Sequence, residues 1–242
     1  GGAVLALFDL TRVRRLEAVR RDFVANVSHE LRTPLTIVGG FAETMVEEEV
    51  PGDVQRQFAE RILGNTRRMQ RIVDDLLDLS RIESGGWVPN PQEIPLAGVV
   101  TDVLAAARDA AERKGLELAT AIAPDATAVY ADATALRQIL GNLVDNAVRH
   151  TATGRVEVYS EPHARGVVVG VRDTGTGIAA EHLPRIFERF YRVDPGRSRE
   201  EGGTGLGLAI VKHLVEAHGG RVKAASEVGA GTSINALFPR AL

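Results

Sequence analysis

The sequence contains no cysteine, which excludes a disulfide framework and any metal site built on thiolates, and which agrees with a reducing cytosol. Long hydrophobic runs are absent too: the longest apolar stretches, Val4–Phe8 and Val167–Val171, are far shorter than the roughly 20 residues that a membrane helix needs. Neither sign of charge predominates, because 29 lysines and arginines stand against 32 aspartates and glutamates. A global basic field that would attract nucleic acid or an anionic membrane is therefore not expected.

Two long helices are predicted in the first third of the chain. Apolar residues recur every three or four positions from Thr11 to Met45 and again from Val54 to Leu79, with Pro51-Gly52 in the break between them. Such a hairpin leaves an apolar stripe with no third layer to cover it. We therefore expect a second copy of the chain to complete a dimeric four-helix bundle.

The rest of the chain has the pattern of a mixed α/β domain. The glycines, prolines and single tryptophan of Gly85–Pro95 are typical of a linker. We expect four regions: 1–11, 12–84, the linker 85–95, and 96–242. Beyond the linker, helical patterns (Leu96–Lys114, Asp132–His150, Gly207–His218) are interleaved with strand-like runs (Glu117–Ile122, Val156–Ser160, Val167–Arg172, Arg221–Ser226, Thr232–Phe238).

A histidine with chemical neighbours lies in the first predicted helix, within the segment FVANVSHELRTPL of Phe23–Leu35. Neutral imidazole is a nucleophile near neutral pH, and the adjacent carboxylate of Glu30 is placed to act as its base. Thr33 lies one turn beyond His29 and shares its helix face, where its hydroxyl would position a water molecule. Pro34 lacks a backbone donor and is expected to bend the helix.

Asn142, Asn146 and Arg149 fall on one face of a later predicted helix, at steps of four and three residues. Amide oxygens suit Mg²⁺, and a guanidinium suits phosphate. The segment predicts a site for a metal-bound phosphate.

The segment Asp173–Ile178 follows an apolar strand-like run and leaves two interpretations open. Gly175–Ala180 satisfies the dinucleotide fingerprint G-x-G-x-x-G/A, and Asp194 lies near the acidic residue expected downstream. That interpretation requires the acidic residue to end a second parallel strand, whereas Phe187–Asp194 has alternating charge and follows a helix-like segment. The nicotinamide interpretation therefore lacks its second strand.

A glycine-rich loop, Gly202–Leu208, opens the last predicted helix. Exposed amides at a helix start attract phosphate, and the absence of a following Gly-Lys-Ser/Thr excludes a Walker A loop.

These segments, in this order, resemble the cytoplasmic core of two-component sensor histidine kinases over about Arg21–Phe238. The resemblance implies an all-α hairpin forming a dimeric four-helix bundle, followed by an α/β sandwich ATP-binding domain of the histidine kinase/Hsp90/gyrase type. It implies autophosphorylation of His29 by ATP with Mg²⁺ and transfer to an aspartate of a response regulator, with Thr33 serving a phosphatase activity.

The resemblance also assigns roles at the ATP site. Asn146 would be the main metal ligand with Asn142 beside it, Asp173 would accept a hydrogen bond from the adenine amino group, and Thr232 would lie near adenine. Phe187–Glu201 resembles the lid over ATP, and His150 departs from the aromatic residue often found at its position. The nucleotide-binding set implied is Asn142, Asn146, Arg149, His150, Asp173, Gly175, Gly177, Arg192, Gly203, Thr204, Gly205, Leu206, Gly207 and Thr232.

Three other interpretations stay open: a nucleotide-binding module that has lost transfer, the nicotinamide oxidoreductase, and an ATP-hydrolysing chaperone or topoisomerase relative. Val4–Thr11 resembles the end of a PAS sensor domain, although an ordinary amino-terminal strand or tail fits nearly as well. We expect a cytoplasmic protein, or the cytoplasmic part of an inner-membrane sensor with its anchor upstream, and no binding of nucleic acid.

Overall fold

The computed structural model describes residues 11–47, 49–194 and 203–240, and the chain divides into two compact units between Ile72 and Val73. Each unit has its own architecture. The strand and turn predicted at 4–11, except for Thr11, and the part of the predicted lid at 195–201 lie outside the described residues.

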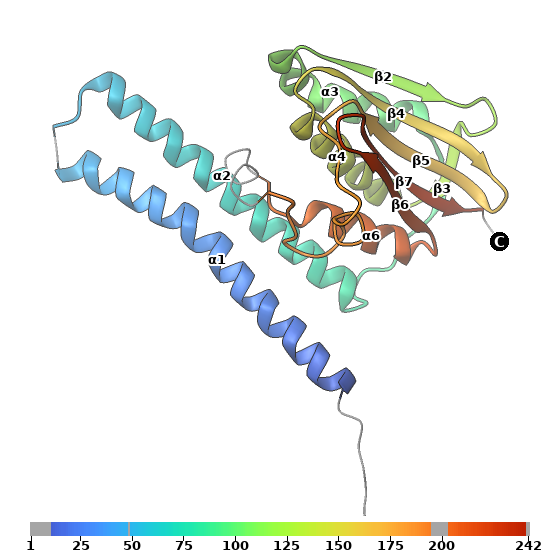
Figure 1. Cartoon of the computed structure of the whole chain (residues 1–242), viewed down its shortest axis with the longest axis horizontal. Helices are drawn as coiled ribbons and strands as arrows, with labels where there is room; N and C mark the ends of the chain where they lie inside the picture. The colour runs from blue at the N-terminus through green and yellow to red at the C-terminus, as the bar shows by residue number, and fades with distance from the viewer. Residues whose placement is uncertain (1–10, 48, 195–202, 241–242) are drawn as a thin grey trace, which may run out of the picture. The chain divides into compact units, whose positions relative to one another are not determined.

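The first unit is a helical hairpin made by α1 (Thr11–Glu47) and the first part of α2 (Gly52–Glu83), drawn in blue and cyan in Figure 1. Near the turn, the rings of Phe41 and Phe58 lie 4.8 Å apart, which joins the two helices by an aromatic contact. Helix α1 continues through Pro34, and the Pro34 side chain is buried. The predicted pair of antiparallel helices is confirmed.

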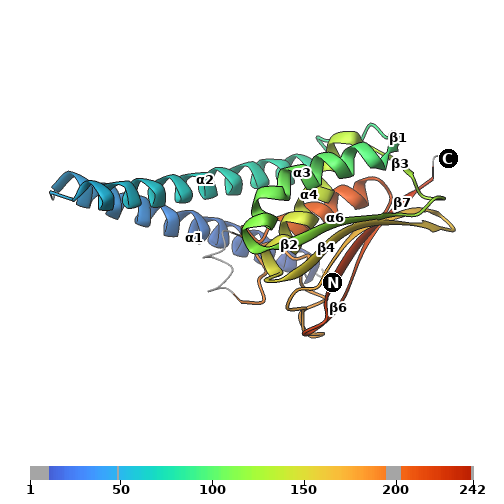
Figure 2. The same cartoon turned by 90° about the horizontal axis from the view of Figure 1, so that it is seen from above.

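The second unit contains a five-stranded sheet with three helices on one face (Figure 2). The strand order is β2-β4-β5-β7-β6, in which β2 and β4 are parallel and every other pair is antiparallel. The apolar core lies between sheet and helices, where Leu140, Ile210 and Phe238 are at most 1% exposed. The elements are β1 (Gln92–Pro95), α3 (Leu96–Lys114), β2 (Leu116–Ile122), β3 (Ala128–Ala131), α4 (Ala133–His150), β4 (Gly154–His163), β5 (Gly166–Asp173), α6 (Gly207–Ala217), β6 (Arg221–Glu227) and β7 (Gly231–Pro239).

Two short strands were not predicted from the sequence. β1 pairs antiparallel with β3, and β1 lies at the end of the segment interpreted as a linker. Both strands are only four residues long, and β1 ends in Pro95. A run of four residues is too short to show the alternation that marks a strand in the sequence, so only the tertiary pairing identifies these two.

The topology excludes the nicotinamide interpretation. β5 pairs antiparallel with both β4 and β7, and the described residues 174–194 contain no strand. A dinucleotide fold requires a second parallel strand ending at the acidic residue. Asp194 therefore does not occupy the position that the fingerprint demands.

Candidate functional site

His29 lies on α1 with its side chain exposed. The hydroxyl of Thr33 donates a hydrogen bond to the His29 carbonyl oxygen at 3.3 Å, as a threonine one helical turn later commonly does. The structure thus places the imidazole and the Thr33 side chain on the same turn. The imidazole is accessible to a reacting group, which the predicted role of phosphoacceptor requires.

Glu30 faces the inside of the hairpin. Its carboxylate accepts a hydrogen bond from Arg68 on α2 at 2.8 Å, and the two side chains are only 10% and 8% exposed. Sequence reasoning missed Arg68, although a basic residue four positions before the buried Ile72 was a signal that it shares the inner stripe. Arg68 therefore fixes the orientation of the carboxylate that is predicted to accept a proton from His29.

The asparagines predicted to hold metal lie on α4. Asp132 caps the start of this helix, accepting hydrogen bonds from the backbone N–H groups of Thr134 and Ala135. Asn142 and Asn146 are half-buried, and the Asn142 amide donates to the carbonyl of Gly207 at 3.5 Å. The helix therefore brings Asn142 to the start of α6, and Asn146 follows one turn later on the same helix.

The cap of α4 is itself held by a second helix. His218, at the end of α6, accepts a hydrogen bond from the backbone N–H of Asp132 at 3.0 Å and contacts the carbonyl of Leu214 through its other ring nitrogen. Burial opposes ionisation of Asp132, but backbone donors including Ala135 and Asn90 outweigh it and lower the pKa of that carboxyl. This hydrogen bond connects the start of α4 to the end of α6, and the sequence did not predict it.

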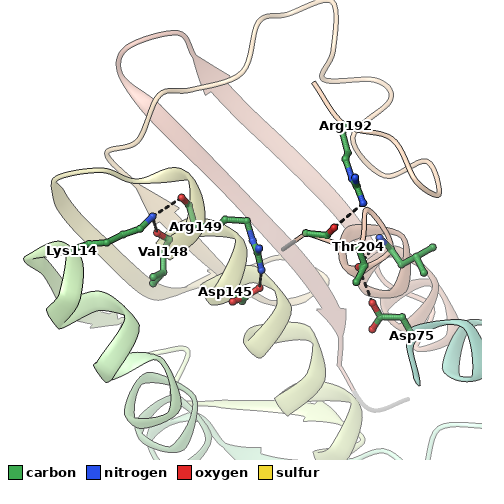
Figure 3. A network of polar contacts seen from close by, with 9 residues as sticks. Asp75, Lys114, Asp145, Val148, Arg149, Arg192 and Thr204 are labelled. Atoms are coloured by element: carbon green, nitrogen blue, oxygen red, sulfur yellow. Dashed lines mark hydrogen bonds and ion pairs between the residues drawn. The ribbon is translucent and has the colours of Figure 1, made fainter. Parts of the chain in front are cut away.

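Arg149 is also placed by α4. Its guanidinium forms an ion pair with Asp145 at 2.6 Å, one turn earlier, and its side chain is only 13% exposed (Figure 3). The pair holds the guanidinium on the helix that carries both asparagines.

Asp173 ends β5, where the sheet meets α4. The N–H of Gly175 donates to its carboxylate at 2.8 Å, and Thr232 stands beside Asp173 in the register of β7. Burial raises the pKa of Asp173, against the lowering effect of hydrogen bonds from the backbone of Gly175 and Thr232. A half-buried carboxylate of this kind suits recognition of a hydrogen-bond donor such as an amino group.

Gly177 occupies a position that only glycine tolerates. Its φ is +70°, and a Cβ there would stand 2.0 Å from the carbonyl oxygen of Glu227. Nearby, the carbonyl of His150 accepts a hydrogen bond from Thr176 at 3.4 Å. The loop after β5 is thereby packed against both β6 and the end of α4.

The glycine-rich loop before α6 is held on two sides. The Arg192 guanidinium donates to the carbonyl of Gly203 at 2.7 Å (Figure 3). On the other side, the N–H of Phe190 donates to the carbonyl of Gly205 at 2.7 Å. The Leu206 side chain is fully buried and anchors the loop, and Gly207 begins α6. The loop presents its backbone at the start of a helix, as a phosphate site requires.

Thr204 in this loop also contacts the last part of α2. Its hydroxyl donates to Asp75 at 2.8 Å and accepts from the N–H of Leu206 at 3.2 Å.

Two further carboxylates of α2 make contacts in the same unit. Asp78 accepts a hydrogen bond from Gln138 at 2.7 Å. Glu83 forms an ion pair with Arg189 and lies 3.1 Å from His213. Burial lowers the pKa of His213, while Glu83 opposes the shift. Sequence reasoning missed these contacts because nothing in a helical pattern indicates which exposed carboxylate meets a loop about 130 residues away.

Two protein families match the chain. The family described as "His Kinase A (phospho-acceptor) domain" matches residues 19–85, and the one described as "Histidine kinase-, DNA gyrase B-, and HSP90-like ATPase" matches residues 131–242. The first includes His29, and the second includes every residue predicted for the nucleotide. The chain belongs to the sensor histidine kinases.

Individual sensor histidine kinases show the same likeness. Sensor protein SrrB of Staphylococcus aureus is 36% identical over 99% of this chain, which spans 41% of the length of that relative. The solved structure of full-length ShkA in complex with AMPPNP is 31% identical, with a TM-score of 0.66 over 91% of this chain and 47% of that one. The structure of the histidine kinase ThkA in complex with the response regulator TrrA shares the fold, with 24% identity and a TM-score of 0.75 over 96% of this chain and 65% of that one.

The residues of this sensor histidine kinase fit an adenine nucleotide and its metal ion. Gly175 stands so close to the end of α4 that a Cβ would lie 2.5 Å from the His150 carbonyl oxygen, so only glycine fits beside the Asp173 carboxylate. The half-buried amides of Asn142 and Asn146 are oxygen donors that suit a hard cation sharing its coordination with phosphate. In the described part of the chain no cluster of three acidic, histidine or cysteine side chains offers a metal site of its own, and no helix is long and apolar enough to cross a membrane.

Proposed function

We propose that this chain is the catalytic core of a protein-histidine kinase, which moves the γ-phosphoryl group of ATP to His29 and then to an aspartate of a response regulator. One observation carries the proposal: an exposed histidine in a phosphoacceptor segment and an ATPase domain of the histidine kinase type occur in the same chain. This pairing disfavours the chaperone and topoisomerase interpretation, which has no use for His29.

The nucleotide is proposed to bind in the second unit. Asp173 accepts a hydrogen bond from the adenine amino group, and the backbone of the glycine-rich loop, together with Arg192, faces the phosphates. The half-buried geometry of Asp173 and the complex of ShkA with AMPPNP support this assignment. Mg²⁺, held by Asn146 and Asn142, supplies neutralisation of phosphate charge when bound.

In the first step the imidazole of His29 attacks the γ-phosphorus of ATP. A phosphorus–nitrogen bond forms, the bond between the γ-phosphorus and the bridging oxygen breaks, and ADP leaves. Glu30 takes the imidazole proton in this proposal, with Arg68 holding its carboxylate in place. In the second step an aspartate oxygen of the partner attacks the same phosphorus, the phosphorus–nitrogen bond breaks, and the imidazole takes its proton back from Glu30.

A phosphatase activity toward the response regulator is also proposed. Thr33 shares the turn of His29, and its hydroxyl would hold a water molecule in line with the aspartyl phosphate of the partner. This geometry carries the phosphatase proposal.

The proposed partners are a second copy of the chain and a receiver domain. Large apolar side chains stay exposed on the hairpin, with Val24 at 57%, Leu35 at 58% and Leu63 at 48%, as expected of a surface that a second hairpin covers. The structure of ThkA with its response regulator supports the second partner. The cytoplasm is the proposed location, since ATP and response regulators are found there.

The direct test is labelling with ATP carrying a radioactive γ-phosphate in the presence of Mg²⁺. We expect a label that is lost in acid and kept in base, as for a phosphoramidate, and its loss in His29→Gln. His163→Gln, which changes an exposed histidine on β4, is the matched control and should label normally. Label that persists in His29→Gln would show that another residue is the acceptor.

A second variant tests the nucleotide site separately from the acceptor. Asn146→Ala should lose ATP-dependent labelling, and yet its His29 should still accept phosphate in reverse from a phosphorylated receiver domain. A nucleotide-binding module without transfer activity would fail in both directions.

A further inference from the structure

Lys114 makes an unusual set of contacts at the end of α4. It is the last residue of α3, and its ammonium nitrogen donates to the carbonyl oxygens of Val148 at 2.9 Å and Arg149 at 2.7 Å (Figure 3). The same nitrogen donates to the carbonyl oxygen of Thr151 at 3.3 Å. Helix α3 itself ends in the left-handed Gly115, so the lysine does not serve its own helix end. It serves the end of a neighbouring helix.

The carbonyls of the last helical turn account for this role. The final carbonyls of any helix lack partners within it, and they carry the negative end of the helix dipole. In α4 the carbonyl of Ala147 accepts from Thr151, and that of His150 accepts from Thr176. Lys114 supplies the donors for the two carbonyls between them, and it does so with a positive charge.

Lysine is chemically suited to this position. Only three of the 29 basic residues of this chain are lysines. An ammonium directs three donors from one compact nitrogen, whereas a guanidinium spreads its donors over a plane. Three carbonyls that converge on one atom therefore fit lysine better than the arginine used almost everywhere else in the chain.

The turn that Lys114 holds borders the nucleotide site on both sides. Asn146 and Arg149 lie within it or directly before it on α4. On the other side, the His150 carbonyl binds Thr176, in the loop between Asp173 and Gly177. A shift of this turn would move the metal-binding and adenine-binding groups relative to each other.

We propose that Lys114 is a positioning residue for nucleotide binding, which sets the distance between the asparagine face of α4 and the loop after β5. The inference rests on the proposed use of these residues for ATP. Lys114 does not touch the phosphoacceptor turn, so its effect belongs to the binding of nucleotide and leaves phosphate chemistry at His29 unchanged.

The test replaces Lys114 by methionine, which keeps the length and removes the charge and donors. We expect the KM for ATP in autophosphorylation, and the Kd for a fluorescent ATP analogue with Mg²⁺, to rise about fivefold, while kcat at saturating ATP changes less than about twofold. Lys212→Met is the matched control, because that lysine lies on α6, 45% exposed and 4.0 Å from Glu216. It should leave both constants unchanged.

Other outcomes decide against the proposal. A KM and Kd equal to those of the unchanged chain, or a fall in kcat and melting temperature with KM unchanged, would show that Lys114 only caps a helix. Should Lys114→Met fail to fold, Lys114→Gln retains an N–H donor group without the charge, and an unchanged Kd in that variant overturns the proposal. The Kd measurement needs no phosphoryl transfer, so it separates failure of this inference from failure of the proposed kinase activity.

Discussion

Replacing Arg68 by methionine should destabilise the helical hairpin and leave the second unit unaffected. The change removes a guanidinium that lies 2.8 Å from the Glu30 carboxylate, in a pair whose side chains are 8% and 10% exposed. Removing one partner of a buried ion pair costs about 3–5 kcal/mol, because the remaining charge keeps its desolvation penalty. We therefore expect Arg68→Met to lower the free energy of unfolding of the hairpin by about 3 kcal/mol.

The partner variant gives the coupling between the two residues. Glu30→Gln keeps the shape of the side chain and removes its charge, so its own cost should be smaller. The double variant should be more stable than the sum of the single changes predicts, with a coupling of about 2 kcal/mol, as residues in direct contact show.

The assay is denaturant unfolding at fixed protein concentration, followed by far-ultraviolet circular dichroism. The only tryptophan, Trp87, lies in the second unit, so its fluorescence reports that unit and serves as an internal control. Arg56→Met is the matched variant, because its pair with Glu60 on α2 is 84% and 66% exposed and should contribute little. An unchanged dichroism transition in Arg68→Met, or an equal shift in tryptophan fluorescence, would refute this account of the ion pair.

Three further predictions concern the proposed sites. Burial raises the pKa of Asp173, and hydrogen bonding to adenine is proposed to require the ionised carboxylate. As the pH is lowered, affinity for a fluorescent nucleotide should therefore begin to fall at a higher pH than the one at which an ordinary aspartate titrates. Asp173→Asn should remove that pH dependence. Gly177→Ala should destabilise the second unit by about 2 kcal/mol or more, lower its melting temperature and weaken nucleotide binding, because Gly177 has a φ of +70° and the added Cβ would lie 2.0 Å from the Glu227 carbonyl oxygen. Gly141→Ala is the control and should have neither effect, because a Cβ at Gly141 would meet nothing within 4 Å. Thr33→Ala should impair dephosphorylation of a receiver domain far more than autophosphorylation, and equal loss of both would indicate a packing role.

The sequence alone determined the elements that carry the chemistry. Helical periodicity is a local property, so α1, α2 and α4 were predicted close to their observed bounds, and the order of the histidine, asparagine and glycine segments indicated the family. The sequence also indicated the close backbone approach at Gly177, because a position where two backbone segments pass close together has room only for glycine. These features depend on a few neighbouring residues, which is why a pattern reveals them.

Only the tertiary structure decided which polar groups meet. Arg68 and Glu30 are 38 positions apart, and Lys114 and Arg149 are 35 positions apart, and no local pattern specifies either contact. The same holds for the pairing of β1 with β3. Each segment is too short to show a strand pattern in the sequence, and each is a strand only because it pairs with the other. Hydrogen bonds of this kind arise after the apolar faces have packed, because packing brings distant backbone and charged groups within about 3 Å and away from water.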